Sequence, residues 1–124
     1  MRIAFSGSRQ RSAVDEIRDI LTKICSHTDE IVHGGCPLGI DAEVQRIAKE
    51  LGFAQKIFYP KTKDSKGYLA RNKEIAEYAN VLYAFPLDRM RSALALRGTV
   101  TRGGTEHTIR QFVKLKKSVY IYCD

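Results

Sequence analysis

Residues 69–86 read LARNKEIAEYANVLYAFP, and this stretch predicts a helix that leads directly into a buried strand. Leu69, Ala76 and Ala79 recur at intervals of seven and three residues, which places them on one face of a helix. Every residue of Val81–Phe85 is apolar, as in a parallel strand that is covered on both faces, and Pro86 ends the run. A helix followed by such a strand is the unit from which α/β proteins are built.

The rest of the chain repeats this alternation. Apolar residues at helical spacing occupy residues 14–25, 44–51 and 109–113. Strands separated by helices pair in parallel, so we predict a small, Rossmann-like, doubly wound α/β sheet of about five parallel strands with helices on both faces. The order of the strands stays open at this point. The further strands are predicted at Arg2–Phe5, Ile31–His33, Ile57–Tyr59 and Val119–Tyr122.

Pro86–Gly104 is the one irregular stretch, and a loop of this length is uncommon in a small domain. Ser92–Leu96 within it is compatible with a short helix or with a contact between subunits. The most basic part of the chain begins here, because eight Lys and Arg follow Pro86 against three Asp and Glu. With a formal net charge of +7, this excess favours an anionic partner such as a nucleotide or nucleic acid, although a solvated basic surface explains it equally well.

Length and composition limit the class of protein. A chain of 124 residues, 44% hydrophobic and 28% charged, suits a single globular domain over residues 1–124. No apolar run approaches the ~20 residues that span a bilayer, and the N-terminus lacks the apolar core of a signal peptide, so we expect a cytoplasmic protein without a membrane partner. Three scattered cysteines and three histidines without ligand spacing argue against a disulfide framework, and against a metal or other cofactor.

Glycine-rich segments follow two of the predicted strands and open the last helix, at Ser6–Arg9, Gly34–Asp41 and Arg102–Thr105. Ligands of open α/β sheets bind at the carboxyl ends of the strands. Glycine lets the backbone approach a ligand, and the first amides of a helix are free donors at its positive end, so these segments predict an anion site. The alternative is that the glycines only form tight turns. The chain has neither G-x-x-x-x-G-K-[ST] nor G-x-G-x-x-G, which argues against a P-loop NTPase and an NAD dehydrogenase.

Individual side chains near these segments have alternative roles. Asn72 lies on the apolar face of its predicted helix and holds either a neighbouring loop or the ligand. Arg71 beside it either reaches the same strand ends or is an exposed surface residue. Asp41 either caps its helix or accepts hydrogen bonds from a ribose hydroxyl. Glu106 is the candidate catalytic carboxylate, or it only complements the dipole of its helix. Cys36 is a small packing residue or a nucleophile.

Four motifs in this order resemble those of the SLOG superfamily, which joins the DprA (Smf) proteins to the LOG-type phosphoribohydrolases. They are IAFSGSR at residues 3–9, GGCPLGID at 34–41, ARNKEIAEYANVLYAFP at 70–86 and GGTEHTIR at 103–110, and the nearest likeness is to the small YspA-like branch. The resemblance covers nearly the whole chain and implies a Rossmann-like nucleotide-binding fold. The residues that it places at the ligand are Gly7, Ser8, Arg9, Gly34, Gly35, Gly39, Asp41, Arg71, Asn72, Gly103, Gly104 and Thr105.

Three functions remain open after this comparison. We predict first a module that senses or sequesters a nucleotide or nucleotide-derived ligand, in a homo-oligomer. The alternative is a LOG-like phosphoribohydrolase that uses Glu106 to cleave the N-glycosidic bond of a nucleoside monophosphate. LOG enzymes carry P-G-G-x-G-T-x-x-E, and here Thr108 stands at the place of their glutamate. A further alternative is weak, DprA-like binding of single-stranded DNA, in which only Tyr and Phe are available to stack on bases.

Overall fold

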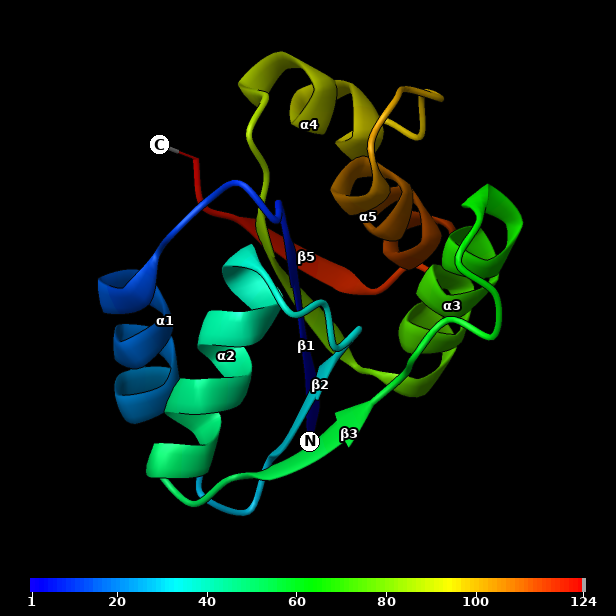
Figure 1. Ribbon diagram of the computed structural model, residues 1–124. Coiled ribbons are helices and arrows are strands. Elements are labelled where there is room, and N and C mark those ends of the chain that lie inside the picture. The colour runs from blue at the N-terminus through cyan, green and yellow to red at the C-terminus, as the bar shows by residue number, and fades with distance from the viewer. Residues whose placement is uncertain (124) are drawn as a thin grey trace.

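Five parallel strands form one sheet in the computed structural model, which describes residues 1–123 (Figure 1). Their order across the sheet is β3-β2-β1-β4-β5, and each neighbouring pair is parallel. The sheet confirms the predicted α/β class and supplies the strand order that the sequence left open. The strands are β1 (Arg2–Gly7), β2 (Glu30–His33), β3 (Ala54–Ile57), β4 (Val81–Phe85) and β5 (Ser118–Ile121).

Helices cover both faces of the sheet, as predicted for a doubly wound fold. One face packs against α1 and α2 and the other against α3 and α5, while α4 lies against α5 (Figure 1). The last turns after α1 form a π-helical segment, η1, in which the amide of Cys25 bonds the carbonyl of Ile20. The helices are α1 (Val14–Asp19), η1 (Ile20–Ile24), α2 (Gly39–Glu50), α3 (Ser65–Tyr78), α4 (Arg89–Leu96) and α5 (Gly104–Lys114).

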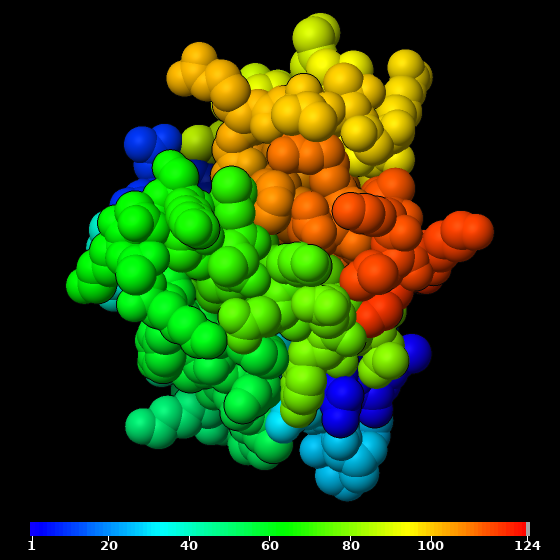
Figure 2. All heavy atoms as spheres, turned by 90° about the vertical axis from the view of Figure 1, so that its right-hand side faces the viewer, coloured from blue at the N-terminus to red at the C-terminus, as the bar shows by residue number. Residues whose placement is uncertain are grey.

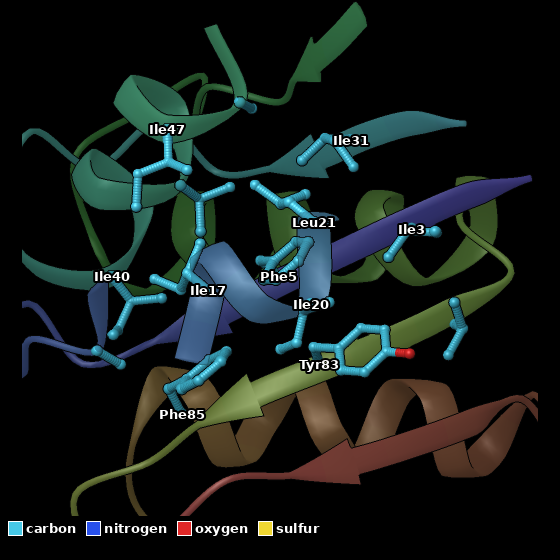
Figure 3. Packing of buried hydrophobic residues seen from close by; sticks show 14 residues of the cluster. Ile3, Phe5, Ile17, Ile20, Leu21, Ile31, Ile40, Ile47, Tyr83 and Phe85 are labelled. Carbon is cyan, nitrogen blue, oxygen red and sulfur yellow. The ribbon is translucent and has the colours of Figure 1, made fainter. Parts of the chain in front are cut away.

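The two hydrophobic cores arise from the alternation of side chains along the strands. Phe5 and Tyr83 point to the face of α1 and α2, where Ile17 and Ile47 pack with them (Figure 3). Their chain neighbours point the other way, and Leu82 packs beneath α3 and α5. The fully apolar run of β4 is therefore explained, because each of its faces is buried under a different pair of helices.

One strand differs from the sequence prediction, and a short helix that the sequence allowed within Pro86–Gly104 is confirmed. The third strand was expected at Ile57–Tyr59 but lies at Ala54–Ile57, where Glu30 of β2 pairs with Ala54. It is an edge strand, so its sequence includes the polar Gln55 and Lys56 and lacks a strong apolar signal. The stretch Pro86–Gly104 contains the short helix α4. Asp88 caps the start of this helix, because its side chain accepts a hydrogen bond from the amide of Arg91.

Strand order creates a crevice at one end of the sheet. The chain builds β1, β2 and β3 in one direction and then returns through α3 to place β4 on the other side of β1. Adjacent connections therefore leave the ends of β1 and β4 on opposite faces, which opens a crevice at their carboxyl ends. The helices α2, α3 and α5 all begin at this end of the sheet (Figure 1). Figure 2 shows the face on which α3 and α5 lie side by side, with α4 and the residues after it at its upper end.

None of the helices within residues 1–123 combines the length and the apolar character that crossing a membrane requires.

Candidate functional site

A cleft of about 1100 Å³ occupies the carboxyl end of the sheet. Segments from across the chain line it: the loops after β1, β2 and β3, α3, the region of α4 and the start of α5. The structure thus brings together every predicted ligand-binding residue except Gly39. The predicted residues that line the cleft are Gly7, Ser8, Arg9, Gly34, Gly35, Asp41, Arg71, Asn72, Gly103, Gly104, Thr105 and Glu106.

Gly39 supports the cleft from outside. Its φ of +70° is strained for other residues, and a Cβ there would lie 2.4 Å from both the Arg9 Cα and the Ser8 carbonyl oxygen. The amide of the next residue, Ile40, donates to the same Ser8 carbonyl at 3.3 Å. Gly39 therefore lets the start of α2 pack directly on the loop after β1, and its place in the motif reflects this contact rather than a position on the cleft wall.

Arg71 ties together two strand ends. Its Nη1 donates to the carbonyl of Gly34, after β2, at 2.7 Å and to the carbonyl of Phe58, after β3, at 3.4 Å. Its Nε donates to Oδ1 of Asn72 at 2.9 Å, and its guanidinium lies over the Tyr68 ring. Of the two roles predicted for Arg71, the structure therefore shows the first: it reaches the strand ends and is not a free surface arginine. Most of its hydrogen bonds are made to other groups of the protein.

Asn72 extends this connection to α5. Its Oδ1 accepts from Arg71, so its amide NH₂ faces α5, donating to the Gly104 carbonyl at 3.3 Å with His107 Nδ1 at 3.4 Å. The Asn72 side chain is almost fully buried, and its hydrogen bonds are made with Arg71 and with the first turn of α5. Holding a neighbouring segment was one of the two roles predicted for it. Burial, and then the charge of Arg110, lowers the pKa of His107, which suits a neutral ring that accepts from Asn72.

Glycines around the cleft differ in what occupies the space beside them. A Cβ at Gly34 would lie 2.3 Å from Nη1 of Arg71, so Gly34 makes room for that side chain. Side chains at Gly7 or Gly35 would overlap Ile40 or Tyr59. Gly104 is different, because no described atom lies within 4 Å of a Cβ built there. Turn geometry and packing thus explain most of these glycines, and Gly104 alone among those named faces open space in the cleft.

The first turn of α5 presents free backbone donors to the cleft. The helix begins after Gly103, and no side chain caps it. Amides at the start of a helix have no acceptor within the helix, and they lie at its positive end. Thr105 lies in this first turn, and both Thr105 and Gly104 line the cleft.

Two buried carboxylates also face the cleft, those of Asp41 and Glu106. Asp41 lies inside α2, whose cap is Leu38, and its Oδ2 accepts from the amide of Cys36 at 3.3 Å. It therefore closes the turn before the helix and is not its cap. Desolvation by burial raises the pKa of Asp41, and Arg71 opposes the shift.

His33 gives Asp41 little charge compensation. Its Nδ1 accepts from the amide of Gly35 at 3.1 Å, and its Nε2 lies 2.8 Å from Oε1 of Gln55. These two partners require one acceptor and one donor nitrogen, which is the pattern of a neutral imidazole. The raised pKa of the Asp41 carboxyl is therefore the direction that the geometry supports.

The sequence analysis missed several residues of the cleft wall. Apolar side chains of Leu38, Tyr59 and Leu69 line it although they are 59%, 63% and 45% exposed. Lys63 lines it as well, from the loop before α3. Tyr59 and Pro60 directly after a predicted strand could have indicated this part of the cleft. Lys63 could not have been singled out from sequence, because it lies among several lysines of one polar loop.

The cations of the cleft fall into two groups. Arg91 pairs with Asp88 at 3.1 Å, and Arg110 donates to the Thr101 carbonyl at 3.1 Å. Arg9 and Lys63 are exposed, and within residues 1–123 neither side chain has a hydrogen bond or an ion pair. These two cations are therefore the ones that remain available to an anionic ligand.

Comparison of the chain with protein-family models, curated proteins and solved structures found no match. The resemblance to the SLOG superfamily stays a prediction from the motifs. Over residues 1–123, no group of three or more His, Cys, Asp or Glu is arranged to hold a metal ion.

Arg71→Ala is expected to destabilise the fold, whereas Arg9→Ala is not. The first change removes bonds to the carbonyls of Gly34 and Phe58, and we expect it to lower the free energy of unfolding by about 1–3 kcal/mol. The second removes an exposed side chain without partners, and its effect should stay within about 0.5 kcal/mol. Urea denaturation of both variants measures the difference. Equal effects would contradict the structural role of Arg71.

Asp41→Asn is expected to raise the free energy of unfolding at neutral pH. The folded protein holds the Asp41 proton more tightly than the unfolded chain, so the stability of the wild type falls as the pH rises above 3.8, the ordinary pKa of an aspartic acid. Asparagine keeps an acceptor for the Cys36 amide and carries no charge. Urea unfolding between about pH 3 and pH 7 should therefore show the two proteins converging at the acid end. Parallel curves would show that burial of this carboxyl has no cost.

Proposed function

We propose that the cleft binds a phosphorylated nucleoside or a ligand derived from one. The observation that carries the proposal is the composition of one cleft at the strand-order reversal: unpaired cations and exposed apolar side chains line the same space. Open α/β sheets bind their ligands at this position. The motif resemblance to the SLOG superfamily points to the same ligand class.

Charge supports an anionic group on the ligand. Arg9 and Lys63 are both exposed, and neither has a partner within residues 1–123. The fork of an arginine matches the oxygens of a phosphate, and a lysine adds a mobile point charge. We therefore assign the phosphate of the ligand to Arg9, after β1, and Lys63, between β3 and α3.

The apolar wall supports a planar ring. Tyr59, Leu38 and Leu69 are exposed and line the same cleft, so together they form one apolar surface inside it. A nucleobase covers such surface and stacks on an aromatic ring, which contributes about 1–3 kcal/mol per base. Gly104 leaves room for the ligand to approach the backbone of α5.

Isothermal titration calorimetry with a panel of nucleoside mono- and diphosphates tests this function. We expect wild-type binding that Arg9→Ala weakens by about ten- to a hundredfold, because a charge-assisted hydrogen bond contributes about 1.5–3 kcal/mol. Gly104→Val should block the ligand while keeping the free energy of unfolding, since a side chain there meets only open space. Gly35→Val is the contrasting variant, because its side chain would overlap Tyr59 and Ile57 and should impair folding.

Absence of binding by every member of the panel would refute the proposal. Binding of single-stranded DNA is measured beside it over a series of salt concentrations, since contacts with several phosphates weaken steeply as salt increases. We expect weak DNA binding that is lost near physiological salt. Tight DNA binding that persists there would favour the DprA-like alternative instead.

Hydrolysis of the N-glycosidic bond is the second candidate, and the two buried carboxylates favour it. In such a reaction water attacks C1′ of the ribose, the bond from C1′ to the base nitrogen breaks, and the departing base takes up a proton. Asp41, whose pKa is raised by burial, suits the proton donor, and Glu106 suits the acceptor of the water proton. Both residues line the same cleft, which the proposal requires.

Chromatography of nucleoside monophosphates incubated with the protein distinguishes the two candidates. We expect no release of free base, because Glu106 is displaced from the place of the LOG glutamate. Release that Glu106→Gln abolishes while ligand binding persists would establish the hydrolase. Release that persists unchanged in Glu106→Gln would point to a contaminating enzyme.

A further inference from the structure

Glu106 is a buried carboxylate without a partner. Its side chain lines the cleft, the residue is only 5% exposed, and within residues 1–123 it makes no hydrogen bond or ion pair. Among residues 1–123 the Glu106 oxygens are not fully buried atoms, so they are open to the cleft, and a ligand that covers them must supply the hydrogen bonds that they lose from water. Asp41 differs, because the amide of Cys36 already donates to it.

The carboxylate of Glu106 turns back over the start of α5. A Cβ built on Gly103 would lie 2.0 Å from its Oε1, so the carboxylate occupies the space that a side chain at position 103 would need. It thereby places a negative charge beside the free amides of the first turn. That charge balances the positive end of the helix and repels a phosphate that approaches it.

The partner that fits Glu106 is a neutral hydrogen-bond donor. A phosphate is disfavoured by the carboxylate itself. A cationic group is disfavoured by the arginines and the lysine that line the same cleft, among them Arg9, Lys63 and Arg71. Hydroxyl groups remain, and the two oxygens of one carboxylate are able to accept from two adjacent hydroxyls.

We propose that Glu106 accepts hydrogen bonds from the ribose 2′- and 3′-hydroxyls of the ligand, and that it makes the cleft select ribonucleotides over deoxyribonucleotides. This inference rests on the proposed function, the binding of a nucleotide in the cleft. The base is accounted for by the apolar wall and the phosphate by Arg9 and Lys63, so the sugar is the part left to lie beside Gly104 and Glu106. Glu106 is then a specificity-determining residue, and its role does not require turnover.

Calorimetry with matched sugars tests the assignment. The ligands are the four ribonucleoside 5′-monophosphates and their 2′-deoxy and 2′,3′-dideoxy counterparts, and the proteins are wild type, Glu106→Ala and Glu106→Gln. Glu74→Ala is the control, because Glu74 is an exposed glutamate on α3 outside the cleft. We expect the wild type and the control to prefer the ribonucleotide over the dideoxynucleotide by about tenfold or more. Glu106→Ala should reduce that ratio to about one, and Glu106→Gln should give an intermediate ratio.

The outcomes separate this inference from the proposed function. If no ribonucleotide binds the wild type, the proposed function fails and the inference fails with it. If ribonucleotides bind but the ratio is the same in wild type and Glu106→Ala, the inference alone is wrong. A Glu106 effect that follows the identity of the base and not the sugar hydroxyls also overturns it. Urea unfolding of each variant checks that it is folded, and Glu106→Gln carries the test if Glu106→Ala is not.

Discussion

The parallel pairing of β1 with β4 is the contact on which the cleft depends. Its register runs from Ile3 opposite Val81 to Gly7 opposite Phe85, so both strands stop at the same level. Because β4 follows β3 in the chain but lies on the other side of β1, the connections leave these two strand ends in opposite directions. The loop after β1 and the start of α5 consequently line the same cleft from its two sides.

Arg71 and Asn72 connect the segments that line the cleft. Together they bond the carbonyls of Gly34, Phe58 and Gly104, which belong to three separate segments at the carboxyl end of the sheet. Carbonyls at strand ends lack a ladder partner, and a planar guanidinium with five donors satisfies several of them at once. An adjacent arginine and asparagine therefore work as a brace whose main partners are backbone groups. This explains why an arginine that lines the cleft is not free to bind an anion.

The α/β architecture was predictable from sequence because burial on both faces leaves a strong pattern. Val81–Phe85 is apolar throughout, and its neighbours in the chain follow helical spacing, so the alternation of elements was clear. The edge strand β3 was placed three residues too late, since pairing on one side only tolerates polar residues such as Gln55 and Lys56. The predicted cleft residues came together because strand ends in a parallel sheet converge. The contacts of Gly39 and the wall that includes Lys63 depend on distances between loops, and local sequence does not encode them.

The positive and negative side chains of the cleft differ in their exposure to solvent. Arg9 and Lys63 are exposed, whereas Asp41 and Glu106 are buried. Cations at the solvent edge attract an anionic ligand and hold its phosphate there at little desolvation cost. Carboxylates deeper in the cleft wall repel that phosphate and accept from hydroxyls, and once a ligand covers them their hydrogen bonds discriminate strongly between ligands. The same two layers of charge would serve a binding module and a hydrolase alike. What separates the two functions is whether a water molecule finds a place between Glu106 and C1′ of the bound ribose. A carboxylate has about four lone-pair sites, so Glu106 is able to accept from both ribose hydroxyls and still hold such a water, and the release of free base is the measurement that separates hydrolysis from binding.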